Sequence, residues 1–130
     1  MLTGRVRRGQ DNDVSRAKFF SAFQDERRLD AVERLVPLAA EAGMSMPHLA
    51  MAFAIAHPGV STALLGARTM AQLDDLLAGL DTVLSDEVLD RIDEIVPPGT
   101  DVGTLDQAYV PAPIEHLRLR RRPPDERAAA

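Results

Sequence analysis

The sequence predicts an α/β fold in which helices dominate and one strand is present, as at the end of a chain built from βα-repeats. The strand is predicted from residues 60–65, a continuous run of mostly apolar or β-branched side chains. A continuous pattern, unlike an alternating one, suits a strand covered on both faces, as in a parallel sheet. Helices are predicted on both sides of this run, because apolar residues recur there at three- and four-residue spacing.

The sequence contains no second long strand that could pair with residues 60–65. Buried backbone N–H and C=O groups cost about 1–3 kcal/mol each when they are left unpaired. We therefore predict that the chain is the end of a larger βα-repeat protein. On its own it would repack into helical structure, or it would borrow a sheet from a second chain or another copy of itself.

The stretch VSTALLGARTMAQ, residues 60–72, predicts a buried strand, a tight turn and the first turn of a helix. Thr69 and Gln72 have the spacing of a capping box, in which each side chain bonds a backbone N–H group at the helix start. The other free N–H groups and the helix dipole attract phosphate, and Arg68 adds a positive charge beside them. The pattern indicates an anion site, but an ordinary strand-to-helix turn with a surface arginine has the same residues.

Four helices are expected, at residues 29–42, 49–56, 70–79 and 86–96. Pro37 is predicted to kink or split the first helix, because proline removes a backbone donor and clashes with the preceding turn. The second helix is apolar almost all round, which predicts deep burial. Its core candidates are Met51, Phe53 and Ile55. We interpret His48 and His57, which flank this helix, as polar residues at its ends rather than as catalytic groups.

Composition and charge exclude several classes of protein. A chain of 130 residues, 45% of them hydrophobic, can bury the core of one modest domain. The absence of cysteine excludes disulfides and cysteine-based metal sites, and we expect no metal. A net charge of -5 argues against a nucleic-acid partner. No apolar run approaches the roughly 20 residues of a membrane span, and the start lacks a signal-peptide core, so we expect a soluble, cytoplasmic protein.

Both ends of the chain are predicted to be irregular. Residues 5–15 are polar and rich in turn-forming residues. The arginines that make this opening region basic are Arg5, Arg7, Arg8 and Arg16. They suit a loop that folds over a phosphate-bearing ligand, and equally a solvated terminus. Residues 98–130 contain many prolines and arginines without apolar periodicity, which predicts an irregular tail.

Three segments occur in order along the chain: LTGRVRRGQ, SMPHLAMAFAIAHPGVSTALLGARTMAQL and LSDEVLDRIDEI. Together they resemble the C-terminal part of the aldo-keto reductases, most closely the branch that includes the potassium-channel β subunits. The resemblance covers roughly residues 1–97 and implies the C-terminal portion of a (β/α)8 TIM barrel. By this likeness, residues 2–4 end the seventh strand, residues 60–65 form the eighth, and residues 85–96 form an extra C-terminal helix.

The resemblance also implies a cofactor, NADPH, whose adenosine and 2′-phosphate the family holds at the turn after the eighth strand. The positions that match this motif are Leu65, Gly66, Arg68 and Gln72. Asp75 stands where the family usually has glutamate, and Leu76 stands where it usually has an asparagine that contacts adenine. Arg5 and Arg16 match basic positions of a loop that clasps the cofactor.

No catalytic residue can be assigned in this chain. The family's reduction of aldehydes and ketones uses an aspartate, a tyrosine, a lysine and a histidine, which the resemblance places in the first half of the barrel. Lys18 and Tyr109 are the only residues of their types, and neither matches the catalytic motif. We therefore expect the chain alone to be inactive. It is interpreted as part of an NADPH-dependent reductase, as a non-catalytic binding module, or as an accessory chain that completes a split barrel.

Overall fold

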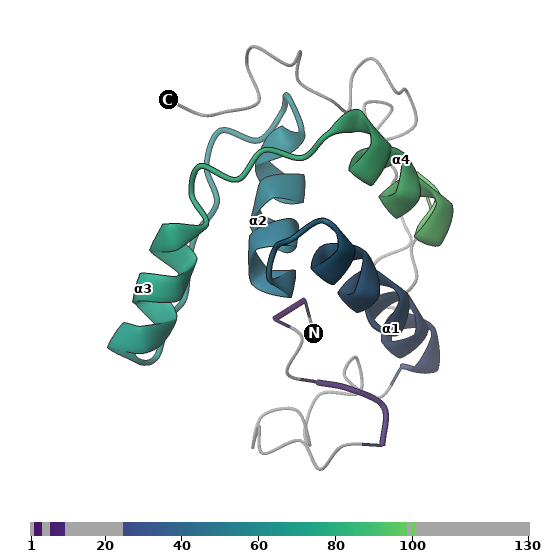
Figure 1. Cartoon of the computed structure of the whole chain (residues 1–130), viewed down its shortest axis with the longest axis horizontal. Helices are drawn as coiled ribbons and strands as arrows, with labels where there is room; N and C mark the ends of the chain where they lie inside the picture. The colour runs from purple at the N-terminus through teal and green to yellow at the C-terminus, as the bar shows by residue number, and fades with distance from the viewer. Residues whose placement is uncertain (1, 4–5, 10–24, 99, 101–130) are drawn as a thin grey trace.

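The computed structural model describes residues 2–3, 6–9, 25–98 and 100, and these contain four α-helices. They are α1 (Glu26–Glu41), α2 (Met46–Ala56), α3 (Met70–Ala78) and α4 (Asp86–Ile95). Figure 1 shows α1, α2 and α4 grouped together, with α3 standing to one side of them. All four helices were predicted, and their observed bounds lie within three residues of the predicted ones.

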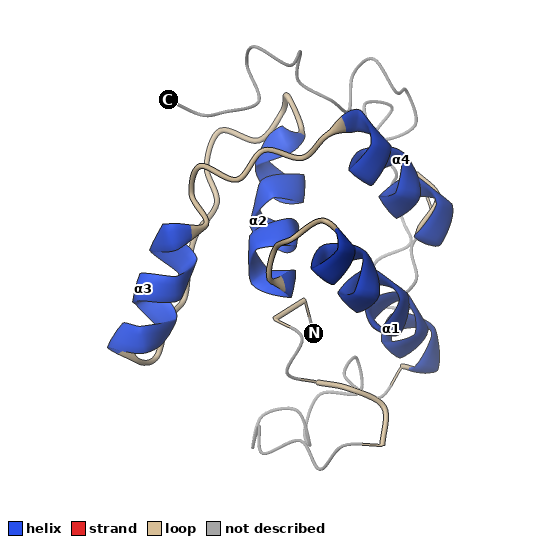
Figure 2. Cartoon of the chain, viewed as in Figure 1, coloured by secondary structure: helices blue, strands red, loops and turns tan. Residues whose placement is uncertain are grey.

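The predicted strand at residues 60–65 is wrong for the described part of the chain, which contains no strand (Figure 2). These residues instead connect α2 to α3 without regular structure, and residues 61–65 are exposed. A strand exists only where its backbone pairs with a neighbour, and the described ranges provide none. Leu2 and Thr3, anticipated at the end of another strand, form a turn. The helix-rich character is confirmed, whereas the described residues contain no sheet of a barrel portion.

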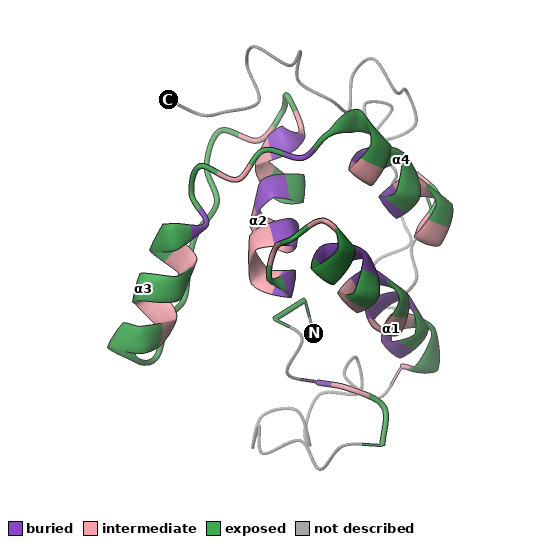
Figure 3. Ribbon diagram, in the orientation of Figure 1, coloured by how far each residue is buried: buried purple, intermediate pink, exposed green. Residues whose placement is uncertain are grey.

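The core lies where α1, α2 and α4 meet (Figure 3). Its most deeply buried large side chains are Leu38 on α1 and Leu49 on α2, which are 1% and 2% exposed. Apolar residues at three- and four-residue spacing give α1 one continuous apolar face, which packs against both other helices. The buried cluster consists of Leu35, Leu38, Ala39, Met46, Leu49, Ala52, Leu84, Leu89 and Ile92.

The turn between α1 and α2 is a Schellman motif. The N–H of Gly43 donates to the carbonyl of Ala40 at 3.0 Å, and the N–H of Met44 donates to that of Ala39 at 3.0 Å. Gly43 has a φ of +72°, which glycine adopts without strain. No single helix in the described ranges is long and apolar enough to cross a membrane. The two helices joined here pass that test of length and composition only as a pair, bent by 96°.

The structure corrects two details of the helices. Pro37, expected to kink or split α1, does not split it: the helix continues from Glu26 to Glu41 with the proline on its exposed side. The missing donor therefore leaves one carbonyl of the preceding turn without its helical partner, but packing keeps the helix continuous. Phe53 was predicted in the core and is 46% exposed. It lines the apolar pocket formed with residues of α1, and no strand of the described residues covers it.

Replacing Leu38 with alanine is expected to lower the free energy of unfolding by about 3 kcal/mol, because it removes a buried side chain and leaves a cavity. The matched control is Leu64→Ala. Leu64 is 95% exposed, so its loss should change the stability by about 0.5 kcal/mol or less. Urea unfolding followed by circular dichroism measures both variants. Equal losses in the two variants would contradict the placement of the core.

Candidate functional site

The residues predicted to bind a cofactor fall into two groups in the structure. Leu65 and Gly66 line an apolar pocket between the helices. Arg68 and Gln72 lie at the start of α3, and Asp75 lies one turn further along that helix. The predicted contacts Arg5 and Arg16 lie outside the described residues. For all seven positions, the role in cofactor binding stays a prediction.

The start of α3 has the local geometry of an anion site. Thr69 is the N-cap, and its Oγ1 accepts a hydrogen bond from the backbone N–H of Gln72 at 3.2 Å. The Gln72 side chain also makes a hydrogen bond back toward the start of the helix. Its Oε1 accepts from the backbone N–H of Arg68 at 3.0 Å, one residue before the N-cap. A capping box would place this second bond on the N-cap itself. The variation holds the backbone of Arg68 against the first turn of the helix.

The first amides of α3 remain available to a ligand. The N–H groups of Thr69, Met70 and Ala71 meet no hydrogen-bond acceptor within the described part of the chain. These residues are exposed, and no acidic side chain occupies the first turn. Free N–H groups at the positive end of the helix dipole favour negative charge. The start of α3 is therefore an accessible, electropositive surface.

The Arg68 side chain supplies the full charge at this surface. It is exposed, and its guanidinium contacts no carboxylate among the described residues. Guanidinium groups present a planar set of donors that matches phosphate oxygens. Arg68 therefore adds a full positive charge next to the open amides of α3, a combination that favours an anion.

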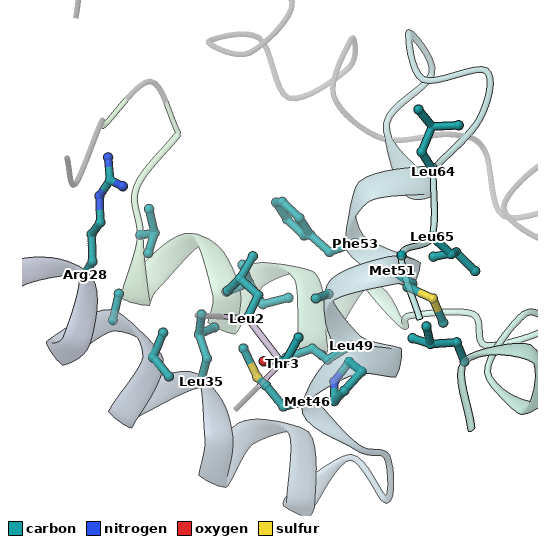
Figure 4. A pocket seen from close by; sticks show the side chains of 18 residues that line it. Leu2, Thr3, Arg28, Leu35, Met46, Leu49, Met51, Phe53, Leu64 and Leu65 are labelled. Carbon is teal, nitrogen blue, oxygen red and sulfur yellow. The ribbon is translucent and has the colours of Figure 1, made fainter. Parts of the chain in front are cut away.

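Beside this helix lies an apolar pocket of about 780 Å³ (Figure 4). Its lining combines side chains of α1, α2 and α4 with those of the segment after α2. Leu2, Leu35, Leu49, Phe53, Leu64 and Leu65 are among them. Leu76 of α3 also lines it, at the position where the resemblance implies an asparagine. An apolar side chain here cannot donate a hydrogen bond to a base, so this wall offers only van der Waals contact.

Two arginines of the basic opening segment are held against α1. The Arg7 Nε lies 2.7 Å from Glu33 Oε1, and the Arg8 guanidinium pairs with Glu26 at 2.8 Å and with Asp30. The backbone N–H of Arg8 also donates to Glu33. Charges engaged in this way compensate the acidic side of α1. The hypothesis of a basic loop over a phosphate therefore retains only Arg5 and Arg16, outside the described residues.

Sequence reasoning missed the contacts that hold α3. His48 was interpreted as a polar residue at a helix end, and it does lie in the first turn of α2. Its Nε2 also lies 2.7 Å from the carbonyl oxygen of Asp75. The two residues are 27 positions apart, so no local pattern could have indicated their contact.

Comparison with known proteins assigns the chain to a family. The sequence profile of the aldo/keto reductase family matches residues 1–97, a range that includes the segment after α2 and the whole of α3. The chain belongs to the aldo/keto reductase family. The resemblance inferred from the sequence motifs is thereby confirmed. Membership in this family indicates an oxidoreductase ancestry, in which nicotinamide cofactors are generally used and the fold is a (β/α)8 barrel.

Individual relatives support the same assignment to the aldo/keto reductases. The chain is 34% identical over 97 residues to Protein tas of Escherichia coli (strain K12), covering 72% of this chain and 28% of that protein. Protein tas of Shigella flexneri matches to the same extent. A probable voltage-gated potassium channel subunit beta of Oryza sativa subsp. japonica is 36% identical over 70 residues, covering 52% of this chain and 21% of that protein. The chain thus spans about a quarter of the length of these relatives.

The carboxyl of Glu33 should titrate far below its usual range, because its hydrogen bonds to the Arg7 side chain and the Arg8 backbone lower its pKa from 4.5 to about 2. Folding lowers this pKa, so the stabilisation is complete above pH 4.5 and is lost as the pH falls from 4.5 toward 2. Carboxyl carbon NMR measures the titration directly. Arg7→Met should return the pKa toward its ordinary value, whereas the control Arg27→Met, which removes a partner of Asp25, should not. A wild-type Glu33 that titrates normally would refute the ion pair.

Proposed function

We propose that this chain is the C-terminal, cofactor-binding part of an NADPH-dependent aldo/keto reductase, which reduces aldehydes or ketones to alcohols. The observation that carries the proposal is the start of α3. Open backbone amides and the exposed, unpaired guanidinium of Arg68 lie together there among the described residues, within the range that matches the family. A phosphate is the ligand that such a combination favours.

The residues at this surface would divide the work of binding. Arg68 would bind the 2′-phosphate that distinguishes NADPH from NADH, and the amides of Thr69 to Ala71 would add hydrogen bonds to its oxygens. Gln72 would act by holding the backbone of Arg68 in place. Leu65 and Gly66 would form the floor beside the adenosine, where they line the pocket. The cofactor, when bound, supplies the hydride.

Proton donation to the carbonyl oxygen would come from another part of the enzyme. The sequence contains one tyrosine, Tyr109, and one lysine, Lys18, and both lie outside the described residues. Neither matches the family's catalytic motif. Since the chain spans 28% of Protein tas, we infer that further polypeptide supplies the catalytic residues and the remaining strands of the barrel.

A second candidate function is that of an accessory or binding module that pairs with another chain. The observation in its favour is the apolar pocket together with the exposed leucines of the segment after α2. Apolar surface of this kind is typical of a protein interface. Binding of NADPH only in the presence of a second polypeptide would distinguish this function from the first.

Arg68→Gln should weaken NADPH binding about ten- to a hundredfold, because a hydrogen bond to a charged group contributes about 1.5–3 kcal/mol. Binding of NADH, which has no 2′-phosphate, should be unchanged. Titration calorimetry measures both nucleotides. Arg91→Gln is the matched control, because Arg91 lies on α4 and pairs with Glu41 at 2.7 Å. Equal affinity of the wild-type chain for NADPH and NADH would count against the proposal.

The purified chain alone should not turn over a broad panel of aldehydes and ketones with NADPH, because no proton donor in it can be assigned to the reaction. Absorbance at the nicotinamide band follows the oxidation of NADPH. A complete aldo/keto reductase assayed in parallel serves as the positive control. Steady turnover by the chain alone would show that its own residues supply the chemistry.

A further inference from the structure

Helix α3 carries the proposed phosphate site but is weakly attached to the rest of the molecule. None of its nine residues is buried, and Figure 3 shows it mostly exposed beside the three packed helices. An element without buried apolar contacts opens locally at low cost. The polar contacts that reach α3 from the other helices therefore contribute to its attachment.

One of these contacts comes from His48 in the first turn of α2. Its Nε2 lies 2.7 Å from the carbonyl oxygen of Asp75, and its side chain is 16% exposed. A carbonyl oxygen can only accept, so the Nε2 atom must carry the hydrogen. The Asp75 carboxylate oxygen Oδ1 lies 3.5 Å from the same nitrogen. Both polar groups of Asp75 are therefore directed toward one histidine.

The carbonyl of Asp75 needs an external donor because of the way in which α3 ends. In a regular helix it would accept from the N–H of Gly79, four residues later. That N–H instead donates to the carbonyl of Leu76 at 3.2 Å. The last carbonyls of a helix have no partner within it, and a histidine side chain can satisfy one of them. His48 therefore caps the C-terminal end of α3 from a different helix.

Gly79 allows the histidine to come this close. A Cβ atom at this position would lie 2.4 Å from His48 Cδ2 and 2.6 Å from His48 Cγ, distances that side chains do not adopt. The φ of Gly79 is -94°, which any residue can adopt. The backbone conformation therefore does not require glycine here, but contact with the imidazole ring does.

We propose that His48 is a positioning residue: together with Gly79 it holds the end of α3 on α2, and so orients the start of α3, which Arg68 immediately precedes. The hold on α3 follows from the contacts above. Its effect on a nucleotide rests on the proposed function. Because α3 is a helix of only nine residues, displacement of its C-terminal end also changes the direction of the amides at its start.

A double-mutant cycle with His48→Ala and Gly79→Ala tests the hold on α3. Amide hydrogen exchange of α3, measured on the full chain, reports its local opening. Gly79→Ala should accelerate exchange about fivefold or more when His48 is present, because its Cβ displaces the ring and removes a hydrogen bond. In the His48→Ala background the same substitution should have little effect, since the space is free. This difference is the coupling between the two residues.

Two further variants separate the hydrogen bond from general disruption. His48→Gln should restore most of the protection, because its side-chain amide can donate to the Asp75 carbonyl. His57→Gln is the matched control, because His57 lies at the other end of α2 and accepts from the Gly59 N–H at 2.9 Å. Equal effects of Gly79→Ala in both backgrounds, or no rescue by glutamine, would overturn the hold. Unchanged unfolding midpoints show that each variant still folds.

Affinity for NADPH, measured on the same variants, tests the positioning role. His48→Ala should raise the Kd about fivefold to tenfold, His48→Gln should return it toward the wild-type value, and His57→Gln should leave it unchanged. Faster exchange with unaltered affinity would overturn the positioning role. A wild-type chain that does not bind NADPH would overturn the proposed function and the cofactor role with it, and the exchange cycle would still decide whether His48 holds α3.

Discussion

The structure depends on the mutual burial of apolar faces of three helices, α1, α2 and α4. Leu38 of α1 and Leu49 of α2 are almost completely enclosed, and Leu89 of α4 closes the same cluster. Removal of this apolar surface from water is the dominant stabilising contribution for a chain without disulfides. The three faces suffice to bury one another, so they form a core without a sheet. Apolar side chains outside this cluster, such as Phe53 and Leu64, remain exposed.

The uncovered surface is continuous with the proposed site. Phe53 on α2 and Leu64 and Leu65 in the following segment are exposed and line the same pocket. In a parallel sheet such residues would be covered on both faces. The chain spans about a quarter of its curated relatives, so a barrel would require strands from further polypeptide.

The arginines of the described residues differ in whether they pair with acidic side chains. Arg7 and Arg8 compensate the acidic side of α1, whereas Arg68 remains exposed at the start of α3 among the described residues. A residue's charge alone therefore does not indicate which arginine is available to a ligand; its neighbours in space decide. The same holds for His48, whose ring on α2 contacts the carbonyl oxygen of Asp75 on α3.

The local sequence determines the helices and their ends, because these depend on residues within a few positions of one another. The N-caps Ser45, Thr69 and Ser85 each accept a hydrogen bond from the backbone N–H three residues later, and the ordered motifs identify the family correctly. Tertiary contacts decide the rest. Whether residues 60–65 pair, whether Phe53 is covered, and which side chain holds Asp75 all depend on groups far apart in the chain or outside it. Hydrophobic periodicity indicates which face of a helix or strand will be buried, but not which part of the protein will pack against it.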